Sequence, residues 1–497
     1  MGQGPNSNRG VIAAGHACTV DVGADVLREG GNAVDAAVAA VAASFTAEPL
    51  LTGLGAGGYM LVTSPAGEAT LLDFFVEAPG RGADPDQRAE LVPVTVSFGD
   101  AVQIFNVGPA SVGAYGMPRG LRDAVERFGS LPLAELLAPG ARLARDGVVL
   151  TAEQAYVIEI LAGIATSTPE CAELFAPGGR LLREGDVFSN PELGDTLERL
   201  GREGAEPFYR GDIATAVVDH LAPRGSMLTR EDLAAYEVVT RTPLRASYRG
   251  RDVLLNPPPS AGGVLIAFAL SLLGRAPGPP TIAQTVDVMD AAQAERTSEF
   301  LDGLAEEGFL ERFLSSRMGS TTHVSVLDVD GWACSVTSSN GEGCGIVVPG
   351  TGLHINNMMG EEDLNPLGFH HHPPGRRLPS MMAPTIVLAG ERPELVLGSG
   401  GSNRIRSAIL QTIINVLDRG MSADAAVRAP RVHFEDGIVY AEPGVDPDAV
   451  EGKDRAIARF RDLNLFFGGV HAVERDPRTG ALSGGGDPRR GGASMVA

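Results

Sequence analysis

A threonine at position 321 stands where a break in the chain would make it chemically reactive. It opens the segment Thr321 to Asp328, whose β-branched residues predict a strand, and Asp330–Gly331 predicts the turn of a hairpin. Inside a chain a threonine hydroxyl is a poor nucleophile. At a new N-terminus the freed α-amino group, with a pKa of about 7.7–8.0, can act as its base. The motif therefore suggests an enzyme that cuts itself.

The second strand of this predicted hairpin ends in hydroxyl and amide side chains. Pairing across the turn places Thr321 opposite about Ser338 to Asn340. Thr337, Ser339 and Asn340 would then fall beside the nucleophile. Taken alone, the same residues also fit an ordinary strand that begins with threonines, so the interpretation needs support from elsewhere in the chain.

That support comes from a glycine-rich segment, Gly398 to Ser402, between a predicted strand and a predicted helix. Successive backbone N–H groups at such a junction can face an anion, including the oxyanion that forms during acyl transfer. The segment therefore predicts a place where negative charge is stabilised.

Other glycine- and histidine-rich stretches favour structural roles. Gly53 to Gly58 matches G-x-G-x-x-G, but a helix and Glu48 precede it and a strand follows, whereas a dinucleotide site needs the opposite order. His370 to His372 lie in a proline-stiffened loop without further ligands at metal spacing. No G-x-S-x-G serine-hydrolase motif occurs. We expect neither a metal nor a cofactor.

The composition indicates which kinds of binding partner and which cellular compartment to expect. With 62 acidic and 40 basic residues, the net charge of -22 argues against nucleic acid and anionic membranes and favours small molecules. The cysteines form no C-x-x-C pair, which favours a reducing compartment. The N-terminus lacks the apolar region of a secretory signal, and no uncharged stretch is long enough to span a membrane. We therefore expect a cytoplasmic protein.

The pattern of elements predicts a layered α/β protein, in 497 residues that allow one elaborated domain or two. A helix pair over Ala17–Arg28 and Ala33–Phe45 precedes paired strands, and the chain from Met117 to about His220 is helical. After the Thr321 hairpin come further strands and a helix that follows Ser402. Antiparallel hairpins between helical regions indicate a sandwich of sheets flanked by helices.

The motifs, taken together, resemble the γ-glutamyltransferase (γ-glutamyl transpeptidase) family of the N-terminal-nucleophile hydrolase superfamily. The residues that carry the resemblance are Val11–His16, Gly30–Ala37, Gly53–Met60, Pro257–Gly263, Thr321–Asp328, Gly350–Asn357, Ala383–Thr385 and Gly398–Ile405. They run nearly from end to end of the chain. As a set they are far more specific than any single motif.

The resemblance implies a four-layer αββα fold made as an inactive precursor. Cleavage between Ser320 and Thr321 would give a large subunit, 1–320, and a small subunit, 321–497, that remain one folded body. Thr321 would then attack an amide and form an acyl-enzyme. Backbone N–H groups of Gly401 and Ser402 would form the oxyanion hole. Ser339 would take the place of the family's second threonine, with Thr337 as its rival.

Several departures from the family pattern concern the substrate. Phe75 stands where γ-glutamyl enzymes have an arginine that binds the glutamyl α-carboxylate, and a phenyl ring cannot neutralise that charge. Met358 replaces a glutamine that holds the α-amino group, although Glu361 matches the acidic residue beside it. The family's paired serines become Ser380 and Met381. These changes predict a more apolar pocket and a substrate other than a γ-glutamyl compound.

Three alternatives remain open at this stage. A true γ-glutamyltransferase could use a relocated arginine, for which Arg376, Arg377 and Arg404 are the candidates. The chain could instead hydrolyse an amide or C–C bond in specialised metabolism, or be an unprocessed, non-catalytic scaffold. In the first two cases the partners are a small-molecule amide or acyl substrate and the two subunits of the same precursor.

Overall fold

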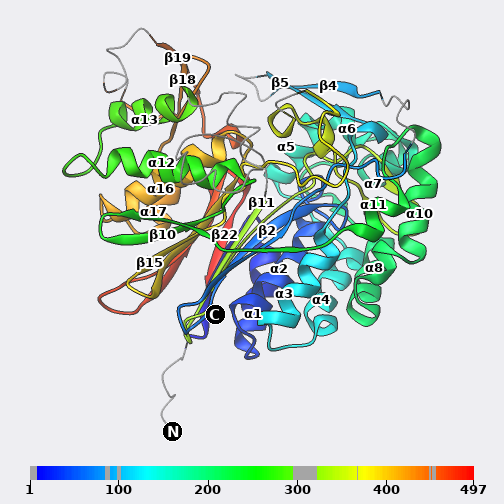
Figure 1. The fold of residues 1–497 in the computed structure, drawn as a ribbon, viewed down its shortest axis with the longest axis horizontal. Coiled ribbons are helices and arrows are strands. Elements are labelled where there is room, and N and C mark those ends of the chain that lie inside the picture. The colour runs from blue at the N-terminus through cyan, green and yellow to red at the C-terminus, as the bar shows by residue number, and fades with distance from the viewer. Residues whose placement is uncertain are drawn as a thin grey trace.

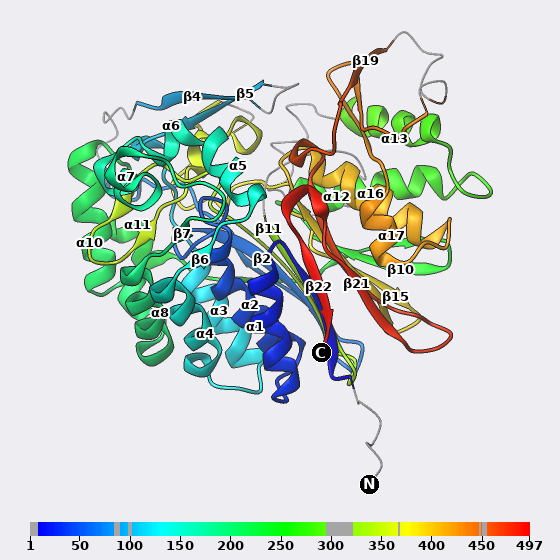
Figure 2. The same cartoon turned by 180° about the vertical axis from the view of Figure 1, so that it is seen from behind.

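The computed structural model describes residues 8–83, 90–97, 102–294, 322–365, 368–446, 449 and 455–497. Ser320 and Thr321 lie outside the described residues. Two antiparallel sheets form the centre of the molecule and lie between two sets of helices (Figures 1 and 2).

The first sheet has seven strands in the order β22-β1-β11-β12-β2-β3-β8. Its strands are β1 (Gly10–Ala14), β2 (Gly57–Thr63), β3 (Ala69–Phe74), β8 (Val239–Arg241), β11 (Thr322–Asp328), β12 (Ala333–Ser339) and β22 (Ala493–Val496). The hairpin predicted around Thr321 is confirmed over its described part, because Thr322 pairs with Ser338 and His323 with Thr337.

The second sheet has six strands in the order β21-β20-β16-β15-β10-β9. Its strands are β9 (Leu244–Tyr248), β10 (Arg251–Leu255), β15 (Thr385–Ala389), β16 (Arg392–Gly400), β20 (Gly469–Arg475) and β21 (Leu482–Gly485). Strands β11 and β12 of the first sheet lie against β16 and β20 of the second. The two sheets therefore pack face to face over the hairpin.

Close packing between the sheets depends on a glycine. A Cβ built on Gly398 would lie 2.3 Å from the ring of His323, so any larger residue would push the two sheets apart. Around this contact the facing strands bury apolar side chains of both sheets, including Leu61, Ile386 and Val396.

Helices cover the outer face of each sheet, which confirms the predicted αββα architecture. On the first sheet lie α1 (Ala17–Arg28), α2 (Ala33–Ala47) and α3 (Met117–Phe128), and α4 (Leu133–Asp146) packs outside α2 and carries α8 (Pro191–Glu203). On the second sheet lie α12 (Ala261–Leu273), α16 (Arg404–Leu417) and α17 (Ala423–Arg428), and α13 (Ile282–Ala294) packs on α12 (Figure 1). Helix α2 is buried along its whole length, and the many alanines on it let neighbouring elements approach closely. Asn32 and Asp35 form a capping box that fixes where α2 begins.

Smaller elements complete the molecule around one end of the sheets. The helices are α5 (Ala152–Ile160), α6 (Ala162–Ala165), α7 (Pro169–Phe175), α9 (Glu206–Tyr209), α10 (Asp212–Leu221) and α11 (Arg230–Ala235). The strands are β4 (Val92–Ser97), β5 (Val102–Val107), β6 (Val148–Val149), β7 (Val187–Phe188), β13 (Val347–Val348), β14 (Leu353–His354), β17 (Val432–Glu435), β18 (Ile438–Ala441) and β19 (Ala456–Arg459). No helix in the described ranges is both long and apolar enough to cross a membrane.

Both sheets combine strands from before and after position 320. The first sheet places β11 between β1 and β12, and the second places β15 beside β10. The segments 1–320 and 321–497 therefore share one hydrogen-bonded core. Their separation into subunits by cleavage stays a prediction.

The glycine stretch after Glu48 has the structural role expected for it. It leads into strand β2, not into a helix. A Cβ on Gly55 would lie 2.5 Å from the carbonyl oxygen of His354, and one on Gly58 would lie 2.4 Å from that of Thr337. Glycine is needed at these positions because another backbone passes too close for a side chain.

Candidate active site

The β11–β12 hairpin carries a buried network of hydroxyl groups around one histidine. His323 Nδ1 lies 2.8 Å from Thr337 Oγ1, and its Nε2 lies 2.8 Å from Ser325 Oγ. Burial lowers the pKa of His323 well below its usual range, which keeps the imidazole neutral. The hydroxyl of Thr337 is therefore already engaged by the neighbouring strand.

Ser339 and Asn340 lie at the end of β12 on the side where β11 begins. The Oγ of Ser339 accepts a hydrogen bond of 2.9 Å from the backbone N–H of Gly341. Asn340 donates to the carbonyl oxygen of His354 at 3.3 Å. Both side chains are buried. Thr321 itself is outside the described residues.

The loop predicted to hold an oxyanion lies between strand β16 and helix α16, as expected. Gly401 has φ of +130° and Ser402 has φ of +54°, so the chain bends sharply there. A Cβ on Gly401 would lie 2.6 Å from the Cα of Gly468, which excludes other residues. Helix α16 is 14 residues long, and its positive N-terminal end lies just beyond this loop.

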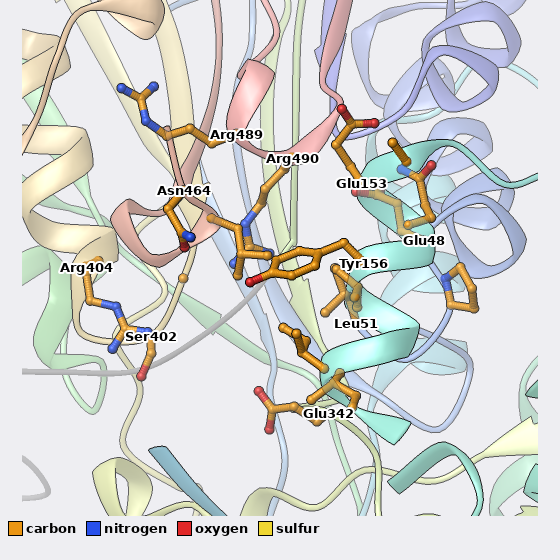
Figure 3. A pocket seen from close by; sticks show the side chains of 18 of the residues that line it. Glu48, Leu51, Glu153, Tyr156, Glu342, Ser402, Arg404, Asn464, Arg489 and Arg490 are labelled. Carbon is orange, nitrogen blue, oxygen red and sulfur yellow. The ribbon is translucent and has the colours of Figure 1, made fainter. Parts of the chain in front are cut away.

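A cavity of about 300 Å³ opens beside this loop. Gly401 and Ser402 line one side of it, and helix α5 lines the other with Tyr156, Val157 and Ile160 (Figure 3). The remaining wall is strongly charged. Its charged residues are Glu48, Glu342, Arg404, Arg489 and Arg490, and α5 adds Glu153 from its own side. The more apolar pocket that the sequence suggested concerned Phe75, Met358 and Met381, none of which lines this cavity, so it stays a prediction.

Glu48 joins this cavity to the start of β11. The hydroxyl of Thr322 donates to its Oε1 at 3.1 Å, while its Oε2 is buried and has no hydrogen-bond partner among the described residues. Burial raises the pKa of Glu48 from 4.5 to about 7. Gly15 makes room for the carboxyl group, since a Cβ there would lie 1.8 Å from Oε1.

Two more charged residues face Glu48 across the cavity. Burial raises the pKa of Glu342 to about 7 and lowers the pKa of Arg490, which interacts electrostatically with both glutamates. Neither Glu48, Glu342 nor Arg490 was singled out from the sequence. Nothing in the local pattern marks them, because their elements are far apart along the chain.

Phe75, Met358 and Ser380, predicted to bind substrate, lie in the packed interior, and none of them lines the cavity. Phe75 stacks on Tyr59 with ring centroids 5.5 Å apart, in the same apolar cluster as Met358. The Oγ of Ser380 accepts a hydrogen bond from the backbone N–H of Met382 at 3.0 Å. Their role in substrate binding stays a prediction.

Glu361 lies beside the turn that follows Ser339. A Cβ built on Gly341 would lie 2.5 Å from Glu361 Oε1 and 2.0 Å from Asn357 Oδ1. The structure therefore brings Ser339, Asn340 and Glu361 together at one end of β12.

The candidate relocated arginines have different surroundings. Arg377 is buried against Asp73 at 3.4 Å and Glu77 at 3.6 Å, away from the cavity. Arg376 does not line the cavity either. Arg404 does, and its guanidinium lies 4.6 Å from the ring centroid of Phe466 while its Nε donates to that residue's carbonyl oxygen.

No group of three or more histidine, cysteine, aspartate or glutamate side chains in the described residues could hold a metal ion. In the predicted histidine loop, His372 Nε2 lies 3.0 Å from the carbonyl oxygen of Leu364. This contact between His372 and Leu364 helps to hold the loop in its conformation.

Comparisons with known proteins give one consistent picture. A family model described as Gamma-glutamyltranspeptidase matches residues 19–497. The glutathione hydrolase proenzyme of Escherichia coli (strain K12) is 30% identical over 555 residues, covering 97% of this chain and 91% of that protein. The Acylase ACY 1 proenzyme of Pseudomonas sp. (strain SE83) is 31% identical over 517 residues, covering 96% and 92%. The crystal structure of cephalosporin acylase from Bacillus halodurans matches with a TM-score of 0.84 at 26% identity, covering 100% of this chain and 97% of that one.

Proposed function

The chain belongs to the gamma-glutamyltranspeptidase family of self-processing amidohydrolases, and on that premise we propose that Thr321 is its nucleophile. We also propose that its substrate is a small-molecule amide without a γ-glutamyl group. The family assignment removes the non-catalytic scaffold from consideration. What it leaves open is the acyl group and its acceptor.

One observation carries the assignment of the site. The cavity wall contains Gly401 and Ser402 together with Glu48, and Glu48 accepts a hydrogen bond from Thr322. Thr321 is the residue that precedes Thr322 in the chain. The residue that follows the proposed nucleophile is thus hydrogen-bonded to the wall of the cavity that holds the proposed oxyanion loop.

Processing and turnover would use the same hydroxyl. The Oγ of Thr321 attacks the carbonyl carbon of Ser320, its proton passes to the departing amide nitrogen, and the resulting ester is hydrolysed by water. The acyl shift frees the α-amino group of Thr321, and hydrolysis of the ester then frees its hydroxyl. That amine then accepts the hydroxyl proton as Oγ attacks the substrate amide, and it returns the proton to the leaving amine. Water or another amine releases the acyl group.

The N–H groups of Gly401 and Ser402 would stabilise the oxyanion of each tetrahedral intermediate. Each such donor contributes about 3–4 kcal/mol to transition-state stabilisation. Their position before α16 adds the favourable field of a helix N-terminus. Ser339 is favoured over Thr337 as the second hydroxyl, because Thr337 is already paired with His323.

Two facts support a substrate other than a γ-glutamyl compound. Phe75 is buried on Tyr59 where an arginine would be needed, and Arg377 is committed to buried carboxylates. Proteins named as acylases are as similar to this chain as glutathione hydrolases are. The cytoplasmic location expected from the sequence remains part of the proposal, to be checked by cell fractionation.

A γ-glutamyl substrate is the second candidate, favoured by Arg404 on the cavity wall. Turnover rates on a panel of chromogenic anilides distinguish the two candidate substrate classes. Turnover of γ-glutamyl anilide above that of simple N-acyl anilides would reverse our preference.

The decisive test of the site is Thr321→Ala. Purified wild-type protein should give two fragments by mass spectrometry, cut before Thr321, and the variant should give one intact chain without activity. Thr240→Ala, at an exposed position, is the matched control and should process and turn over normally. A single full-length wild-type band that persists through long incubation would count against the proposal.

A further inference from the structure

Three side-chain contacts join the start and the middle of helix α16 to strand β17. The residues that α16 and its N-cap contribute are four apart in sequence, so they follow one face of the helix. Only the contact nearest the oxyanion loop contains a carboxylate. In order from the loop, the contacts are Asn403 with Glu435, Ser407 with His433, and Gln411 with the backbone of Val432.

The first contact holds the residue that directly follows the oxyanion loop. The side-chain amide of Asn403 donates to one oxygen of Glu435, and the other oxygen lies 3.4 Å from His433 Nε2. His433 Nδ1 lies 2.7 Å from Ser407 Oγ. Because an ionised carboxylate only accepts hydrogen bonds, Nε2 of the histidine carries the proton and Nδ1 accepts from the serine. Two donors therefore converge on Glu435.

The carboxyl group of Glu435 is ionised although it is largely buried. Burial alone would raise its pKa, but the hydrogen bond from His433 and the positive charges of Arg404 and Arg406 lower the pKa from 4.5 to about 2. Burial lowers the pKa of His433, which keeps the ring neutral. A charged acceptor makes a stronger hydrogen bond than a neutral one. The contact beside the oxyanion loop is therefore the strongest of the three.

The oxyanion loop needs such an anchor because its backbone is strained. Ser402 has φ of +54°, a left-handed conformation that residues with a Cβ rarely adopt and that persists only where the surrounding structure holds it. The N–H groups of Arg404 and Ile405 donate to the carbonyl oxygens of Gly401 and Ser402, both at 3.1 Å. The peptide groups of the loop are thus coupled to the start of α16, where Asn403 is held.

We propose that Glu435 is a positioning residue for acyl transfer. By holding Asn403 it keeps the N–H groups of Gly401 and Ser402 directed at the oxyanion. Glu435 is not among the described residues that line the cavity, so it acts without touching the substrate. This inference rests on the proposed function and adds a residue to the same site. Without the carboxylate, the loop would relax towards a less strained backbone and turn its donors away.

The kinetics of Glu435→Ala test this role. Release of 4-nitroaniline is followed in the first turnover of the N-acyl 4-nitroanilide that wild type hydrolyses fastest, and it is normalised to the amount of processed chain found by mass spectrometry. The rate constant of acylation should fall about 10- to 100-fold, while the substrate concentration at half-saturation changes less than about threefold. Displaced donors weaken the binding of the transition state more than that of the ground state.

Gln411→Ala is the matched control. It removes hydrogen bonds between the same helix and strand about two turns farther from the loop. It should lower Tm, as Glu435→Ala does, but leave the rate constant of acylation within about twofold of wild type. An equal loss of acylation in both variants, with both folded by near-ultraviolet circular dichroism, would leave Glu435 a general structural role and overturn the proposal.

A reversed pair tests the contact itself. Asn403→Asp would set two carboxylates against each other and should slow acylation about 10-fold or more. Adding Glu435→Gln restores one donor and one acceptor, and should bring the rate constant back to within about threefold of wild type. A double variant no faster than Asn403→Asp alone would contradict the proposed contact.

The positioning role and the proposed function would fail in different ways. A wild-type protein that neither cleaves itself before Thr321 nor releases 4-nitroaniline would reject the proposed function and the positioning role with it. A wild-type protein that does both, with Glu435→Ala acylated at the same rate, would reject the positioning role alone.

Discussion

Replacement of Glu48 by glutamine should change how stability depends on pH. The carboxyl group is buried, and within the described part of the chain one of its oxygens has a hydrogen-bond partner and the other has none. A pKa raised from 4.5 to about 7 corresponds, at about 1.4 kcal/mol per unit, to roughly 3 kcal/mol that favours the protonated form in the folded protein. Glutamine keeps the acceptor for Thr322 but cannot ionise.

Because the pKa of Glu48 is raised in the folded protein, its contribution to stability decreases as the pH rises. A carboxyl group with a raised pKa contributes its stabilisation fully below pH 4.5 and loses it as the pH rises through about 7. Wild type should therefore lose stability relative to Glu48→Gln between pH 5 and pH 8. At about 2.1 cal/mol/K per residue, the 497-residue chain has an unfolding entropy of about 1 kcal/mol/K. The difference in Tm should then change by roughly 3 °C.

Differential scanning calorimetry at pH 5 and pH 8 measures this change. Both proteins should also carry Thr321→Ala, so that neither gains an α-amino group near Glu48 during the experiment. Glu29→Gln, at an exposed position, controls for the general effect of removing a carboxylate. If the difference in Tm between wild type and Glu48→Gln is the same at both pH values, the burial argument for Glu48 is wrong.

Three further predictions concern the hairpin and the core. Gly398→Ala should lower the free energy of unfolding by about 1–3 kcal/mol in urea titrations, because its methyl group would meet the ring of His323. Arg377→Met should cost about 1.5–3 kcal/mol and lower Tm, since it removes one of two cations from each of two buried carboxylates, Asp73 and Glu77, which keep Arg241 and Arg81; an unchanged Tm would contradict this pairing. Ser339→Ala should slow self-cleavage in a gel time course by about 10-fold or more, whereas Thr337→Val should mainly lower Tm by removing the bond to the histidine. The reverse pattern would assign the second hydroxyl to Thr337.

Local patterns in the sequence predicted the parts of the site that local forces build. β-branched runs and a turn at Asp330–Gly331 were enough for the β11–β12 hairpin and its register. Glycines between a strand and a helix were enough to locate the Gly401 loop. These elements could be predicted from the sequence because side-chain periodicity and turn chemistry depend on residues that are close in sequence.

The charges in the cavity could not be predicted in the same way. Glu48 follows helix α2 and Arg490 lies close to the C-terminus, and each enters the cavity only because the fold brings their segments beside the oxyanion loop. Phe75 in place of an arginine predicted a more apolar acyl pocket; its ring is packed into the core and does not line the charged cavity, so that pocket stays a prediction. The sequence by itself determined the layered fold, the hairpin that Thr321 opens and the kind of chemistry its hydroxyl could do. Only the tertiary structure decided which charged groups surround the cavity, because pairings between distant segments, and the space left by Gly15 and Gly469, place those side chains.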